Sequence, residues 1–234
     1  MEGSITMMIN KRYYVISLIY LLFIYNGNAM ANCDFDDFPV MDEMSVTTIM
    51  DDANYNNRPM MVQSFIADDA SYHDVVDYYH NVWDKRYNDT AFGMWHQITT
   101  ITNDCMMTVQ VAAQNNLTPS NGRLIISNPT AADVSDNLGA DVLAPPDSVV
   151  VSDLVTDDGP KKGRITMLAA GGSTSDVARF YLNEMQRKGW SIDRQFTEGE
   201  AQVLVFRKGL DISNILVIKA GDMSQVLINE EIIK

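Results

Sequence analysis

Two histidines and an aspartate of one short segment are the residues whose types and spacing could do chemistry. His73, Asp77 and His80 follow one another at intervals of four and three residues, so on a helix their side chains stack on one side. Two imidazoles flanking a carboxylate could hold Zn²⁺ or Cu²⁺. The same stripe lies opposite the apolar Val76 and Tyr79, however, and it lacks the i, i+4 histidine spacing of zinc-binding helices. We therefore predict a solvated face with no metal and no other cofactor. The alternative is a metal-binding protein or a hydrolase built on these three residues.

The hydroxyl groups of the chain show the pattern of helix caps rather than of nucleophiles. No Gly-x-Ser-x-Gly turn occurs in the sequence. Ser71 stands three residues before Asp74, and Ser173 stands three residues before Asp176. In such a pair the serine accepts a hydrogen bond from the helix and the aspartate reaches back to the backbone of the serine. The sequence thus predicts two helix starts and a protein that is not an enzyme.

The two capping pairs belong to segments that resemble each other. Residues 71–79 align without a gap against residues 173–181, and both segments have serine, two residues, aspartate, valine and then an aromatic pair. A strand-like apolar run precedes each segment, and further strand-like runs follow it. We predict an α+β fold of two tandem repeats, each with one helix packed on a mostly antiparallel sheet. The predicted element order is β-β-α-β-β-β, with one more strand in the second repeat, and the predicted helices span 72–86 and 174–188.

The composition of the chain places the boundaries of these repeats. Residues 129–146 are rich in proline, glycine, aspartate and small residues and show no sustained periodicity, which is typical of a linker. The sequence therefore predicts a first α+β domain over 32–128, a linker over 129–146 and a second α+β domain over 147–234.

The first 31 residues have the three-part layout of a signal peptide. Lys11 and Arg12 precede an apolar run over 13–25, and a stretch of small residues follows that run. The run is shorter than the roughly 20 apolar residues that a membrane-spanning helix needs. We expect cleavage after Ala31 and release into the periplasm, with a retained membrane anchor as the alternative.

The two cysteines, Cys33 and Cys105, follow the expected cleavage site. An exported chain is found where thiols oxidise, so we predict a disulfide between them. Acylation of Cys33, as in a bacterial lipoprotein, is the other possibility, but Asn32 is a poor residue for the position before an acylated cysteine.

Net charge excludes two classes of partner. The chain has 17 Lys and Arg residues against 31 Asp and Glu residues, a formal net charge of −14. Such a chain repels nucleic-acid phosphates and anionic lipid headgroups. We predict no nucleic-acid partner and no stable membrane insertion after the signal is removed.

The second helix segment carries a recognisable signature. The segment contains Asp176, Val177, Phe180, Tyr181, Gly189 and Trp190 in this order. In these residues it resembles the DV..FY…GW helix signature of small exported bacterial modules of unknown function. Two such units in tandem also resemble the helix-grip domains of the outer-membrane assembly lipoprotein BamC. The resemblance implies a Gram-negative periplasmic protein without a catalytic role. Together with exposed sheet edges, which can accept a strand from another protein, it predicts an adaptor that binds cell-envelope or secretion-system proteins.

Overall fold

The structure is a computed structural model that describes residues 33–102, 104–113, 118–129, 138–139 and 141–234. The predicted signal peptide and part of the predicted linker lie outside these residues. Within the described part of the chain, no helix is long and apolar enough to cross a membrane.

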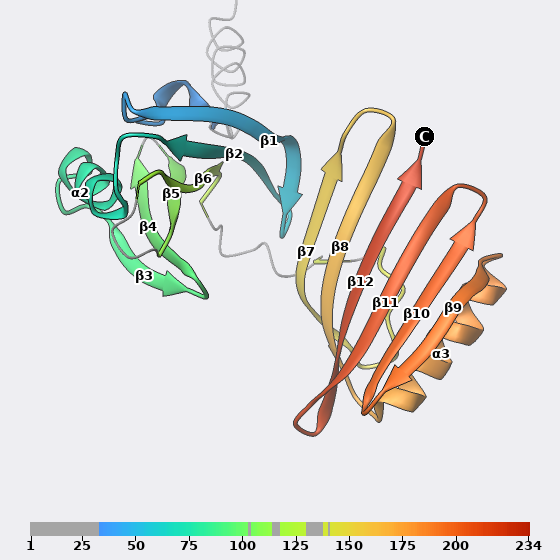
Figure 1. Cartoon of the computed structure of the whole chain (residues 1–234). Coiled ribbons are helices and arrows are strands. Elements are labelled where there is room, and N and C mark those ends of the chain that lie inside the picture. The colour runs from blue at the N-terminus through green and yellow to red at the C-terminus, as the bar shows by residue number, and fades with distance from the viewer. Residues whose placement is uncertain (1–32, 103, 114–117, 130–137, 140) are drawn as a thin grey trace, which may run out of the picture. The chain divides into compact units, whose positions relative to one another are not determined.

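Strands make up most of the described chain (Figure 1). The elements before residue 130 are η1 (Phe35–Asp37), β1 (Met44–Tyr55), β2 (Arg58–Ala67), α2 (Tyr72–Val82), β3 (Asn88–Phe92), β4 (Trp95–Thr102), β5 (Cys105–Ala112) and β6 (Ser120–Ser127). The elements after residue 141 are β7 (Val149–Asp157), β8 (Lys161–Ala170), α3 (Thr174–Arg187), β9 (Ser191–Glu198), β10 (Ala201–Lys208), β11 (Asp211–Ala220) and β12 (Met223–Ile233).

The predicted fold class of two separate helix-on-sheet repeats is wrong. All strands form one twelve-stranded sheet in the order β3-β4-β5-β6-β2-β1-β7-β8-β12-β11-β10-β9, and every neighbouring pair is antiparallel. Strands β1 and β7 join the sheet by pairing Ala53 with Thr156 and Tyr55 with Leu154. The prediction failed for a physical reason. Backbone hydrogen bonds extend a strand through polar residues, and a search for short apolar runs does not find those parts of the strand. The described residues thus form a mainly antiparallel β structure with two α-helices.

Two local predictions also change. The helix predicted over 72–86 ends at Val82, because Asp84 and Lys85 have positive φ angles of 43° and 61°, which the right-handed helix excludes. Strand β3 is one strand more than the three predicted after the helix of the first repeat, and it pairs with β4 along its whole length. Residues 88–92 thereby become one edge of the sheet.

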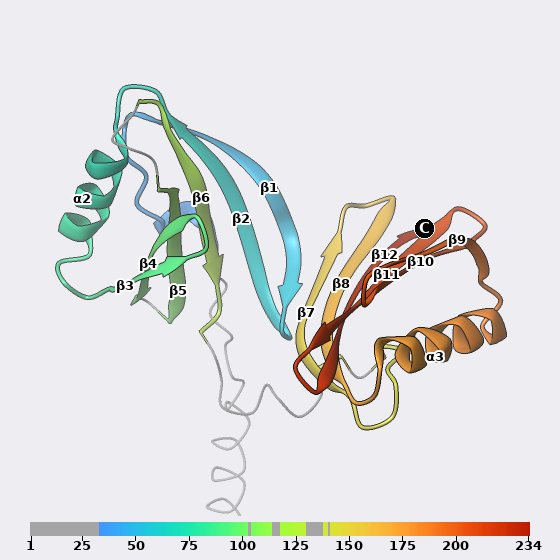
Figure 2. The ribbon, with the colours of Figure 1, turned by 60° about the horizontal axis from the view of Figure 1, so that its bottom comes forward.

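The best-defined core lies between α3 and the strands after residue 141. Helix α3 contacts β9, β10 and β11 and lies along one face of these strands (Figure 2). Alternate residues of β10 and β11 are buried on this side, as a half-covered sheet requires. The core comprises Leu168, Val177, Tyr181, Met185, Leu204, Phe206, Ile215, Val217, Val226 and Ile228, with several smaller or flanking side chains.

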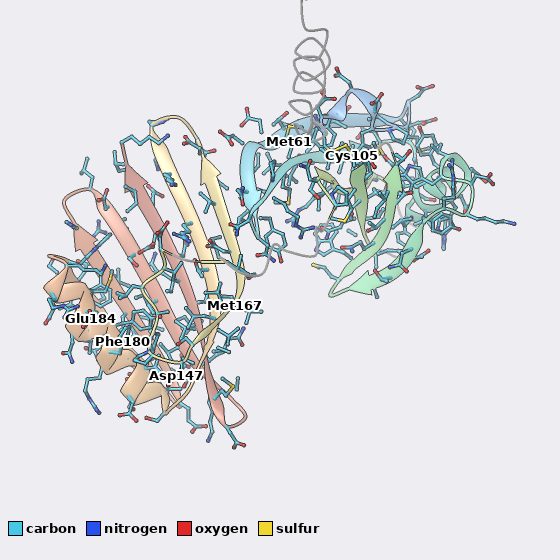
Figure 3. All side chains as sticks on the ribbon, turned by 180° about the vertical axis from the view of Figure 1, so that it is seen from behind. Met61, Cys105, Asp147, Met167, Phe180 and Glu184 are labelled. Atoms are coloured by element: carbon cyan, nitrogen blue, oxygen red, sulfur yellow. A yellow bond between two sulfur atoms is a disulfide. The ribbon has the colours of Figure 1, made fainter. Side chains whose placement is uncertain are left out.

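The predicted disulfide is present. Cys33 and Cys105 are bonded, with their Cα atoms 5.6 Å apart and a separation of 72 positions in the sequence. Cys105 is the first residue of β5 (labelled in Figure 3) and is buried. The bond therefore fastens the first described residue of the chain to the sheet.

A buried tyrosine on each helix fastens a segment of irregular chain. Tyr79 of α2 donates its hydroxyl hydrogen to the carbonyl of Pro39 at 2.9 Å, and Tyr181 of α3 donates to the carbonyl of Leu143 at 3.2 Å. Both rings are fully buried. Burial raises the pKa of both hydroxyls, so both remain protonated donors at neutral pH.

Removing either hydroxyl should destabilise the protein measurably. We expect Tyr79→Phe and Tyr181→Phe each to lower the free energy of unfolding by about 1 kcal/mol, because the buried carbonyl loses its donor. Urea unfolding followed by circular dichroism measures this change. The control is Tyr55→Phe, at an exposed ring, which should change the value by less than about 0.5 kcal/mol. Equal effects at Tyr55 and Tyr79 would contradict the assignment.

Candidate functional site

The two capping serines each accept a hydrogen bond at the start of their helix. The backbone N–H of Asp74 donates to Oγ of Ser71 at 3.3 Å, and the backbone N–H of Ser71 donates to Oδ2 of Asp74 at 2.8 Å. At the start of α3, the backbone N–H of Asp176 donates to Oγ of Ser173 at 3.2 Å. These hydrogen bonds occupy both serines in starting the helices.

The structure separates the three residues of the predicted helix stripe. His73 and Asp77 are exposed on α2, whereas His80 is half-buried near the C-terminal end of that helix. His80 instead lies beside Asp89 of β3 and His96 of β4. We call His80, Asp89 and His96 the histidine cluster. Among the described residues, neither His73 nor Asp77 belongs to a group that could hold a metal ion.

One carboxylate connects the two imidazoles of the histidine cluster. Nε2 of His80 donates to Oδ2 of Asp89 at 2.8 Å, and Nε2 of His96 donates to the other oxygen, Oδ1. Nδ1 of His96 is in hydrogen-bond contact with the hydroxyl of Tyr72. A carboxylate only accepts hydrogen bonds, so both Nε2 atoms carry a hydrogen. Nδ1 of neutral His96 is then the acceptor for the Tyr72 hydroxyl.

The surroundings of the histidine cluster hold its rings in place. The ring of His80 stacks on that of Tyr87, with centroids 4.4 Å apart and planes 3° from parallel. Burial, and then the charge of Asp89, raise the pKa of Tyr72, so its hydroxyl keeps its hydrogen at neutral pH. A hollow of about 370 Å³ adjoins the cluster, and its lining includes Tyr72, Asp89, Trp95 and His96.

Sequence reasoning missed Asp89 and His96 because it compared residues of a single helix. The two residues are 9 and 16 positions beyond His80, and they come close to it only through the β3–β4 hairpin. One signal was available in the sequence. His96 is one of only three histidines in the chain, and it stands in a run of residues that we expected to form a strand.

A second candidate site is the sheet face opposite α3. Five apolar residues lie side by side in the ladder, one on each of five strands: Met167, Leu227, Leu216, Val203 and Phe196. We call this set the apolar row; Met167 is labelled on its strand in Figure 3. On four of the strands a neighbour along the strand points to the helix side and is buried, namely Leu168, Val226, Ile215 and Leu204. The row therefore lies on the face that α3 does not cover.

The apolar row is partly accessible and ends at an edge of the sheet. Phe196 is 52% exposed and Leu227 is 39% exposed, whereas Met167, Leu216 and Val203 are half-buried. Strand β9, which contains Phe196, is the last strand of the sheet, and all eight of its residues are exposed. The row thus leads from the middle of the strands after residue 141 to a strand with one free hydrogen-bonding side.

A charged group on strands β7 and β8 has a structural role. Asp153 of β7 is 4% exposed. It accepts hydrogen bonds from Nε and Nη2 of Arg164, at 2.9 and 2.7 Å, and from the hydroxyl of Thr166 at 2.8 Å. Burial alone would raise the pKa of Asp153, but these hydrogen bonds and the charge of Arg164 outweigh burial and hold the pKa below its usual value. The polar atoms named here are all hydrogen-bonded within this group. The group therefore contributes to stability rather than to reactivity.

Comparison with known proteins adds one finding. A protein-family model described as START domain-like matches residues 149–223, from β7 to the first residue of β12. This part of the chain is similar to that family. The match contains all of α3 and all of β8, β9, β10 and β11, which are four of the five strands of the apolar row. The fifth strand, β12, is matched only at Met223. No curated protein and no solved structure matches the chain.

Proposed function

We propose that this protein is a non-catalytic periplasmic protein that binds another protein of the cell envelope or of a secretion system. The observation that carries the proposal is the apolar row on the uncovered face of the sheet. Contiguous exposed apolar surface is uncommon on soluble proteins and marks sites of interaction. The disulfide supports an oxidising compartment, since such bonds form and persist outside the cytosol.

The row and strand β9 together suit one mode of recognition. A partner strand that adds to the free side of β9 would gain backbone hydrogen bonds, and its apolar side chains would extend the row beyond Phe196. Backbone hydrogen bonds supply affinity in this mode, and the side chains of alternate residues supply specificity.

Charge restricts the partner further. The chain has a formal net charge of −14, which repels acidic proteins and attracts basic ones over the length of the screening distance. The partner is therefore an exported protein with an apolar patch and a basic surface around it. High salt should slow its association, because the charges act on the encounter rather than on the packed contact.

Site-specific photo-cross-linking in the native compartment tests the proposal. A photoreactive residue at Phe196 or at Leu227 should give the same cross-linked product. The matched control position is Leu210, which is 75% exposed in the turn between β10 and β11 and lies outside the row. It should give no such product. Excess wild-type protein should suppress the product, whereas excess of the folded double variant Phe196→Asp, Leu227→Lys should not.

Two results would contradict the proposal. One is a product with the mass of two copies of this chain, which would make the row a self-association surface. The other is the absence of any product shared by Phe196 and Leu227, or an equal yield of that product at Leu210.

A further inference from the structure

We propose that His80, Asp89 and His96 bind one Zn²⁺ ion, with water completing the coordination. The proposal concerns a different surface from the apolar row and does not depend on the protein-binding function. The sequence favoured a helix face without metal because only residues of one helix, α2, were considered together. The structure brings an imidazole from α2, a carboxylate from β3 and an imidazole from β4 to one point.

The distances are compatible with a metal site after a small adjustment. The three ligand atoms lie within 4.8 Å of one another. Tetrahedral Zn²⁺, with bonds of about 2.0–2.2 Å to nitrogen and oxygen, separates its ligand atoms by about 3.4 Å. The imidazole nitrogens therefore need to approach each other by about 1.5 Å at most, and their hydrogen-bonded contacts with Asp89 must lengthen toward that separation, both movements on the scale of a side-chain adjustment. All three side chains are partly exposed, so they have room to make them.

The donor set selects the class of ion. Two imidazole nitrogens and one carboxylate oxygen suit borderline transition metals, whereas Ca²⁺ and Mg²⁺ prefer oxygen ligands alone. Cu²⁺ competes for the same donors, but two histidines and one carboxylate with a water are a ligand set that Zn²⁺ takes in proteins. The hollow beside Asp89 and His96 gives space for that water.

Tyr72 makes the change of proton position on His96 possible without loss of a hydrogen bond. To bind a metal through Nε2, neutral His96 must carry its hydrogen on Nδ1 instead. A phenol hydroxyl can donate or accept, so Tyr72 accepts from Nδ1 when the metal is bound and donates to Nδ1 when it is not. Metal-binding histidines commonly have such a partner on their second nitrogen, where it fixes the ring orientation.

The test is titration of the full mature protein, freed of metal by EDTA and dialysis, with ZnCl₂. Isothermal titration calorimetry should give one ion per chain with a Kd below about 10 μM, and the melting temperature should rise with Zn²⁺ concentration as ln(1 + [L]/Kd) requires. Substituting Co²⁺ should give the intense visible absorption of a tetrahedral nitrogen and oxygen site. MgCl₂ and CaCl₂ at the same concentrations should leave the melting temperature unchanged.

Variants connect the binding to these residues. Asp89→Asn, His80→Gln and His96→Gln should each weaken Zn²⁺ binding at least tenfold. His73→Gln is the matched control, because it removes an exposed histidine of the same helix outside the cluster. It should leave the Kd unchanged. The melting temperature of each variant in EDTA shows that it is folded, and three different ligand variants guard against one that fails to fold.

The outcomes are decisive in both directions. A wild-type Kd above about 10 μM, or a Kd unchanged in all folded cluster variants, overturns the site. Loss of binding in His73→Gln also overturns it, because the ion would then bind to the stripe of α2. One ion per chain that is lost with any of the three cluster residues, and kept in His73→Gln, supports it.

Discussion

Replacing Cys105 with serine is expected to lower the free energy of unfolding by about 4 kcal/mol. The bond to Cys33 closes a loop of 72 residues, and restricting so long a loop removes much of the conformational entropy of the unfolded chain. Cys33→Ser should cost the same, and the double serine variant should cost no more than either, because the three proteins lack the same bond. Urea unfolding in oxidising buffer measures all of these values.

Reduction supplies the control for the disulfide. Dithiothreitol should lower the stability of the wild-type protein to that of the double variant and leave the double variant unchanged. A loss below about 1 kcal/mol would mean that native strain offsets the entropic gain, against the expectation from loop length.

Replacing Asp153 with alanine is expected to cost about 3 kcal/mol or more. The substitution removes the carboxylate to which the partly buried guanidinium of Arg164 is hydrogen-bonded, and it removes an acceptor of the fully buried Thr166. Breaking one side of such a pair is far more damaging than a surface change. The matched control is Asp52→Ala, at an exposed aspartate of β1, which should change the value by less than about 0.5 kcal/mol.

Acid should remove the contribution of Asp153. Since its folded pKa lies below the unfolded value, the stabilisation is fully present above the unfolded pKa of about 4 and is lost as pH falls through the folded pKa. The difference in stability between the wild-type protein and Asp153→Asn should therefore be greatest at neutral pH and shrink below about pH 4. A difference that is constant from pH 7 to pH 2.5 would contradict this account.

The parts of the structure that were predictable are those that neighbouring residues determine. Ser71 and Asp74 form a cap because they are three positions apart, and the same spacing applies to Ser173 and Asp176. The disulfide could be predicted because the chain offers one pair of cysteines.

The parts that were not predictable depend on pairing between distant segments. Nothing in the residues near Tyr55 indicates that they pair with residues near Leu154, and this contact makes one sheet where two were expected. The histidine cluster was not predicted for the same reason, since Asp89 and His96 come close to His80 only after the β3–β4 hairpin has formed. The end of α2 was also not predictable. It is followed by Asp84 and Lys85, which have positive φ angles, and neither residue is a proline or a glycine.

Strand β9 has a consequence for how the protein survives at high concentration. An exposed strand edge invites stacking of copies into fibres. Here Asp193 and Arg194 place charges on the edge, Asp193 is also 3.4 Å from Arg207 of β10, and the ladder between β9 and β10 is interrupted by a shift of register beside Val205. Charges and irregular registers of this kind discourage indiscriminate strand addition. The chain can thus keep an edge open for one matching segment while resisting the growth of aggregates.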